Sequence, residues 1–172
     1  MNAIARLCPN CGLCCDSTLF SDVELRAGDD ADRLAELGLS LNPKANGKLA
    51  FAQPCPCFDG RLCSIYGQRP KRCQLFECGL LKKVQAGVLT TSAALTKISE
   101  AKTLAKNVRR LLRSCGDEDD EAALAKRYAR TMKQPIDLAK DARGAERRGE
   151  LMLAVADLMH ALQRDFFVSD GG

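Results

Sequence analysis

The sequence predicts a mainly α-helical protein with little β structure. Nine of the ten cysteines lie in two compact blocks between Cys8 and Cys78, among short segments rich in proline and glycine. After residue 90, apolar residues recur at three- and four-residue steps, which is the period of helices with one buried face. We therefore expect a small cysteine-rich domain over residues 1–81, followed by a bundle or hairpin of about three helices over residues 82–172.

The N-terminal part predicts only short elements. Ser21 and Glu24 have the spacing of a capping box and predict one helical turn. Residues 30–37 predict a short helix that ends at Gly38. Residues 48–52 and 62–66 are strand candidates, and the pair Asp59-Gly60 between them is typical of a turn.

The C-terminal part predicts three helices. The apolar stripe of the first helix ends at Cys115-Gly116, where glycine can terminate a helix. Asp117 or a neighbour is placed to cap the second helix, and Gln134-Pro135 marks its end. The third helix carries one apolar side, listed as Leu151, Val155, Leu158, Leu162 and Phe166.

The N-terminus shows no secretory signal, and no apolar run approaches the ~20 residues that span a bilayer. We therefore expect a cytoplasmic protein with no membrane association. Thiols stay reduced in that compartment, so clustered cysteines favour metal binding over disulfides. The chain has no Trp and few aromatic residues. Metal–thiolate bonds would then stabilise the N-terminal domain.

The net charge of +4 lies entirely in the second half of the chain. Residues 1–80 carry nine basic and nine acidic residues, whereas residues 81–172 carry seventeen and thirteen, a difference of four. Basic clusters of this kind can contact phosphates. We interpret them instead as the solvated faces of amphipathic helices, because aromatic platforms for bases are missing. Nucleic acid is therefore an unlikely partner, and a protein partner for the helical half is expected.

The first cysteine block contains two overlapping Cys-x2-Cys segments. Pro9 and Gly12 favour a tight turn that would direct both sulfurs of Cys8 and Cys11 at one ion, as in a zinc knuckle. The overlap with Cys14 also resembles the opening of a ferredoxin motif. Cys15 does not complete that motif, so zinc and an iron–sulfur cluster both remain open, with a slight preference for the cluster.

The second block has intervals of one, five, nine and four residues, and therefore lacks the second Cys-x2-Cys pair of a zinc ribbon. Cys55 is ambiguous, because it is either a ligand or a neighbour of Cys57. Isolated Cys115 is expected to be a buried small hydrophobe. The predicted metal ligands are Cys8, Cys11, Cys14, Cys15, Cys57, Cys63, Cys73 and Cys78, with Cys55 as a possible extra ligand.

Two further residues of the second block have alternative interpretations. Arg69 could relieve the negative charge of a thiolate cluster, or it could only shape the turn before Pro70. Tyr66 is expected to fill a small core.

These residues resemble the CxxCxxCC family of zinc- or iron-chelating, YkgJ-like cysteine-cluster proteins. The first block matches the motif that names the family, and Cys63-Ser-Ile-Tyr66, Arg69-Pro70, Cys73 and Cys78 resemble its second block. The resemblance covers residues 6–81. It implies that the eight predicted ligands chelate the metal, in a small bacterial cytosolic protein of unassigned activity. The same cluster occurs in flagellin lysine methylases, where it is associated with an iron–sulfur cluster.

No catalytic set is visible in the sequence. The single histidine, His160, lies on a mostly apolar helix and is expected to be structural or exposed. The leading hypothesis is a metal-binding cysteine-cluster protein that is not itself an enzyme. The alternatives are an iron–sulfur component of a redox or methyl-transfer enzyme and a zinc module that binds nucleic acid.

Overall fold

The computed structural model describes residues 3–136 and 141–168 and confirms a mainly α-helical fold with little β structure. Seven α-helices, three short strands and one 3₁₀ turn at Tyr66–Gln68 follow one another in this part of the chain. They are α1 (Ala3–Cys11), β1 (Asp22–Glu24), α2 (Ala31–Glu36), β2 (Leu41–Pro43), β3 (Leu49–Ala52), α3 (Lys71–Leu75), α4 (Gly79–Gln85), α5 (Thr91–Ser114), α6 (Leu124–Lys133) and α7 (Ala142–Asp165).

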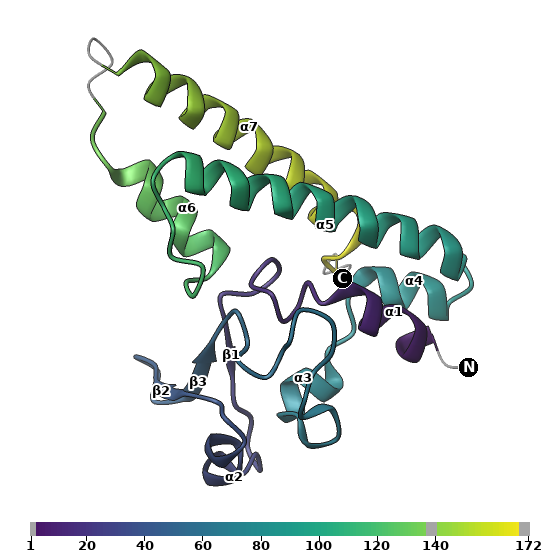
Figure 1. Cartoon of the computed structure of the whole chain (residues 1–172). Coiled ribbons are helices and arrows are strands. Elements are labelled where there is room, and N and C mark those ends of the chain that lie inside the picture. The colour runs from purple at the N-terminus through teal and green to yellow at the C-terminus, as the bar shows by residue number, and fades with distance from the viewer. Residues whose placement is uncertain (1–2, 137–140, 169–172) are drawn as a thin grey trace.

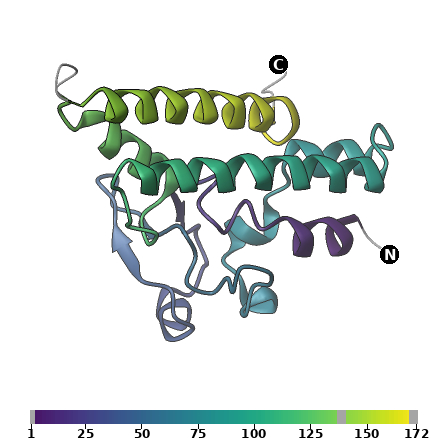
Figure 2. The same cartoon turned by 45° about the horizontal axis from the view of Figure 1, so that its top comes forward.

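The helical half is built on α5 and α7, which run side by side in opposite directions, with α6 at the end where they connect (Figure 1). On the other side of α5 lies α1, so α5 is packed between α7 and the start of the chain (Figure 2). The three predicted helices are confirmed. Among the described helices, none combines the length and the apolar character needed to cross a membrane.

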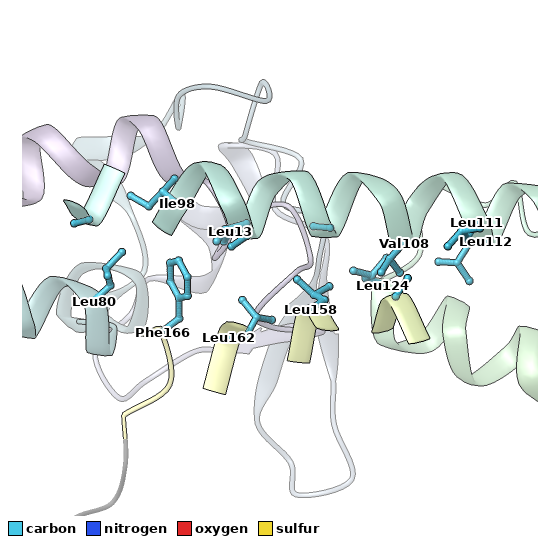
Figure 3. Packing of buried hydrophobic residues seen from close by; sticks show 14 of the residues in the cluster. Leu13, Leu80, Ile98, Val108, Leu111, Leu112, Leu124, Leu158, Leu162 and Phe166 are labelled. Atoms are coloured by element: carbon cyan, nitrogen blue, oxygen red, sulfur yellow. The ribbon is translucent and has the colours of Figure 1, made fainter. Parts of the chain in front are cut away.

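The large core forms where α5 meets its neighbours. Figure 3 shows side chains from α4, α5, α6 and α7 meeting along one side of α5. The buried members are Leu7, Leu13, Leu80, Leu81, Ala94, Ile98, Ala101, Ala105, Val108, Leu111, Leu112, Leu124, Leu151, Ala154, Leu158, Leu162 and Phe166. This core contains residues from both sides of the boundary expected at residue 81.

The small core lies beneath a three-stranded antiparallel sheet of order β1-β3-β2. Phe51 of β3 pairs with Val23 of β1 and with Leu41 of β2. The buried members of this core are Val23, Leu34, Leu39, Phe51, Cys57 and Ile65. The helix predicted at residues 30–37 and the strand predicted at residues 48–52 are confirmed as α2 and β3.

Two predictions for the N-terminal part are wrong. The segment after Ser21 is strand β1 rather than a helical turn, because Val23 is buried against Phe51 and this pairing overrides the local capping signal. Residues 62–66 form no strand. The Asp59 carboxylate accepts hydrogen bonds from the N–H groups of Arg61 and Leu62 and turns the chain, which leaves a single bridge between Phe58 and Cys63.

Asp117 does not cap α6, which begins after Ala123 without a side-chain cap. Its carboxylate is buried and accepts hydrogen bonds from Arg127 (2.9 Å) and Arg130 (2.6 Å). Leaving a buried carboxylate without a charged partner costs more free energy than leaving a helix N-terminus without a cap. The Asp117 side chain therefore pairs with the two arginines of α6.

Candidate metal centre

The first cysteine block begins on a helix. Cys8 and Cys11 lie on α1, three residues apart and therefore on one face, so the predicted tight turn between them is wrong. The chain turns one residue later, at Gly12, whose φ of 75° is in the left-handed region. The carbonyl oxygen of Gly12 accepts hydrogen bonds from the N–H groups of Cys15 (2.8 Å) and Asp16 (3.0 Å). This turn follows the helix directly and presents Cys14 and Cys15 beside it.

Cys78 is far from the first block in the sequence but lies beside it in the structure. It is the residue before α4, and α4 packs against α1. Burial, together with the charges of Cys78 and Cys8, raises the pKa of Cys11 to about 12. Burial also raises the pKa of Cys14, where Cys11, Cys15, Cys78 and Cys8 act in the same direction. Cys8, Cys11, Cys14 and Cys78 lie on α1, on the turn after it and at the start of the helix packed against it, and we call them the first thiol group.

Several cysteines of the second block lie near Cys15. The N–H of Cys55 donates a hydrogen bond to the carbonyl oxygen of Cys15 (2.8 Å), which joins the two cysteine blocks. Burial, together with the charges of Cys55, Cys73 and Cys63, raises the pKa of Cys15 to about 12. The phenyl ring of Phe58 also fills the space in which a side chain at Gly12 would lie. We call Cys15, Cys55, Cys57, Cys63 and Cys73 the second thiol group.

Cys57 differs from the other members of the second thiol group. It is buried in the small core, with 5% of its surface exposed. Its Sγ donates a hydrogen bond to the carbonyl oxygen of Leu37 (3.4 Å), and its own carbonyl accepts one from the N–H of Ser64 (2.8 Å). Cys55, Cys63 and Cys73 are only partly buried and pack at the edge of that core.

Arg69 lies near both thiol groups. Its charge lowers the pKa of Cys8 in the first group and of Cys73 in the second, although burial raises both pKa values overall. Its Nε also donates to the carbonyl oxygen of Tyr66 (2.9 Å), and its guanidinium lies 3.7 Å from the centre of the Tyr66 ring. The arginine thus shapes the turn and brings a positive charge to the thiols. Tyr66 itself is exposed, so its predicted place in a core is wrong.

Two basic residues of α5 hold the first block in place. The Arg109 guanidinium donates to the carbonyl oxygen of Asp16 (2.6 Å) and forms an ion pair with its carboxylate (3.3 Å). Lys102 donates to the carbonyl oxygen of Asn10 (3.2 Å). Sequence reasoning missed both contacts, since the only signal was a basic face on a helix.

Three other arginines of the helical half pair with acidic residues of the chain. Arg113 pairs with Asp120 (2.6 Å), and the carboxylate of Asp117 binds both Arg127 and Arg130. This pairing supports the interpretation that these clusters stabilise and solvate the helices.

Cys115 and His160 lie apart from the thiol groups. Cys115 caps the far end of α5, thirteen residues or about 20 Å along the helix from Lys102, which contacts α1. It packs against the large core, as expected for an isolated cysteine. His160 is exposed on α7.

Within residues 3–136 and 141–168, no three side chains of His, Cys, Asp or Glu are arranged closely enough to hold a metal ion. The donors nevertheless suit a metal, because nine thiols and no imidazole gather here, and thiolates are the preferred ligands of zinc and of iron–sulfur clusters. Such sites close as the ion binds and the thiols lose their protons.

Comparison with known proteins gives one match. Residues 7–94 match the model of the CxxCxxCC family, described as "Putative zinc- or iron-chelating domain". No curated protein and no solved structure matches the chain significantly. The match extends beyond residue 81 and includes α4 and the start of α5.

Proposed function

Because this chain belongs to the CxxCxxCC family, we propose that it is a metal-binding protein that holds zinc or an iron–sulfur centre through the thiols of its N-terminal half. The observation that carries the proposal is the return of Cys78 to α1 and of Cys55, Cys63 and Cys73 to Cys15. Cysteines that served only as small apolar residues would be spread through the cores. Here, apart from Cys57, they gather in two groups outside the buried part of the cores.

The candidate ligands are the thiols of the two groups. The sequence predicts eight of them, Cys8, Cys11, Cys14, Cys15, Cys57, Cys63, Cys73 and Cys78, and the structure sets Cys57 apart from the others by burying it in the small core. Cys55 joins this set because its backbone is bonded to Cys15. The positive charge of Arg69 near both groups would offset the negative charge of metal-bound thiolates.

Between the two metals, we favour an iron–sulfur cluster because three thiols of the first block follow Cys-x2-Cys-x2-Cys and all three belong to the first thiol group. Zinc would use the same thiolates and would serve a structural role, since zinc sites with four protein ligands have no open position for chemistry.

The test is anaerobic purification followed by visible spectroscopy and by analysis of iron, zinc and acid-labile sulfide per chain. We expect either a coloured protein with iron and sulfide or a colourless protein with zinc. Freshly isolated protein that is folded, free of metal and fully reactive towards thiol reagents would contradict the proposal.

Substitution of Cys11 provides the matched comparison. Cys11→Ser should lower the metal content, because a serine hydroxyl is a poor substitute for a thiolate. Cys115→Ser should leave the metal content unchanged, because Cys115 lies at the C-terminal end of α5, apart from both thiol groups. The reverse result would show that the ligands are assigned wrongly.

A further inference from the structure

The thiols of the N-terminal half are divided between the two cores of the protein. In the first thiol group, Cys11 and Cys78 pack against the large core, beside α1 and α4. In the second thiol group, Cys55, Cys63 and Cys73 pack against the small core beneath the sheet. The two groups therefore pack against different cores, and the adjacent residues Cys14 and Cys15 join them.

The first thiol group contains four cysteines, which is the number that a closed tetrahedral zinc site or a cubane iron–sulfur cluster takes. Three of them come from α1 and the turn after it, and the fourth precedes α4, which packs on α1. No thiol of the second block except Cys78 is needed to complete this set.

The second thiol group contains five cysteines, one more than such a centre uses. Cys57 lies beside Cys55, but it is the member that is buried in the small core, and its Sγ donates a hydrogen bond to the carbonyl oxygen of Leu37 (3.4 Å). Cys55 lies beside Cys15, because its N–H donates a hydrogen bond to the carbonyl oxygen of Cys15 (2.8 Å). Cys63 and Cys73 pack against the same small core as Cys55 and are, like Cys55, only partly buried.

We infer that the protein holds two separate metal centres, one bound by Cys8, Cys11, Cys14 and Cys78 and the other by Cys15, Cys55, Cys63 and Cys73. Cys57 is then a packing residue of the small core rather than a ligand. This inference rests on the proposed metal-binding function and adds the number of centres and the ligands of each. Neighbouring residues Cys14 and Cys15 serve different centres and hold them side by side.

The test uses zinc as the probe and counts the ions bound to the full chain. Metal-free, reduced protein is titrated with Zn²⁺, and the bound ions are counted by native mass spectrometry. We expect two ions for the wild type, one for Cys78→Ser, one for Cys73→Ser and none for the double variant. The same proteins, reconstituted anaerobically with iron and sulfide, should show the iron content of each single variant reduced by half.

The choice between Cys55 and Cys57 has its own variants. Cys55→Ser should bind one zinc ion, like Cys73→Ser. Cys57→Ala and Cys57→Val, which keep an apolar side chain in the small core, should bind two, as should the control Cys115→Ser. Cys55→Ser decides the assignment alone if neither Cys57 variant folds.

Three results would overturn the inference. One bound ion in the wild type, lost in Cys78→Ser and in Cys73→Ser alike, would show a single shared centre. Loss of both ions in either single variant would show that the centres are not separate. Two ions in Cys55→Ser would show that Cys55 is not a ligand. A wild type that binds neither zinc nor iron would instead contradict the proposed function.

Discussion

The helical region and the sheet region of this protein differ greatly in how much apolar surface they bury. Seventeen buried residues of the described chain form the large core around α5, whereas six form the small core beneath the sheet. One of those six is Cys57, and most of the thiols of the second group border the same core. The region with the weaker core is therefore the one in which bound metal would contribute folding free energy.

The first thiol group, in contrast, lies beside the large core of the helical region. Cys11 and Cys78 pack on the large core, and Gly79, the residue after Cys78, donates a hydrogen bond to the carbonyl oxygen of Phe166 (2.8 Å) at the end of α7. A side chain at Gly79 would collide with the backbone of Phe167. Helix packing thus positions the first group, whereas the second group depends on short loops.

The largest expected effect follows removal of metal by a strong chelator. The sheet and helices α2 and α3 should lose their protection from amide hydrogen exchange, because the small core is too small to stabilise them alone. The amides in the middle of α5 and α7 should stay protected. Hydrogen exchange measured by mass spectrometry distinguishes the two regions, and simultaneous loss of protection in both would show that they do not differ in their need for metal.

Mild acid should have the next largest effect. Burial raises the pKa of Cys11 and Cys15 to about 12, so both thiols carry protons at neutral pH and must release them when metal binds. Falling pH favours the protonated thiol, and the affinity should decrease about tenfold per pH unit for each thiol bound.

Competition with a zinc chelator between pH 8 and pH 6 measures this dependence on acid. The helical content of α5 and α7, followed by circular dichroism, should change little over the same range. An affinity that does not vary with pH would contradict binding through thiols.

The smallest expected effect concerns the large core alone. Leu162→Ala should lower the free energy of unfolding by about 2–5 kcal/mol, because it leaves a cavity between α7 and α5 where Leu162 is 1% exposed. The metal content should not change. Met159→Ala, at a position on the same helix that is 40% exposed, is the control and should shift the unfolding midpoint in denaturant far less. A loss of metal in Leu162→Ala would show that the two cores are coupled.

The sequence alone determined the class of the fold, the three C-terminal helices and the membership of a zinc- or iron-chelating family. Helix periodicity is a local property, and Thr91–Ser114 and Ala142–Asp165 show it clearly. Nine closely spaced thiols indicate a metal whatever their arrangement in space. Short elements were less predictable, since Ser21 and Glu24 carry a helix signal in a segment that pairs with β3.

Only the tertiary structure decided which thiols lie together. Cys78 joins Cys8 because α4 packs on α1, and Cys55 lies nearer Cys15 than its neighbour Cys57 because the small core buries Cys57. Spacing along the chain cannot reveal such groupings, because they depend on long-range packing between segments that are dozens of residues apart. The sequence therefore predicted the donor atoms, and the packing of two unequal cores sorted the thiols into groups.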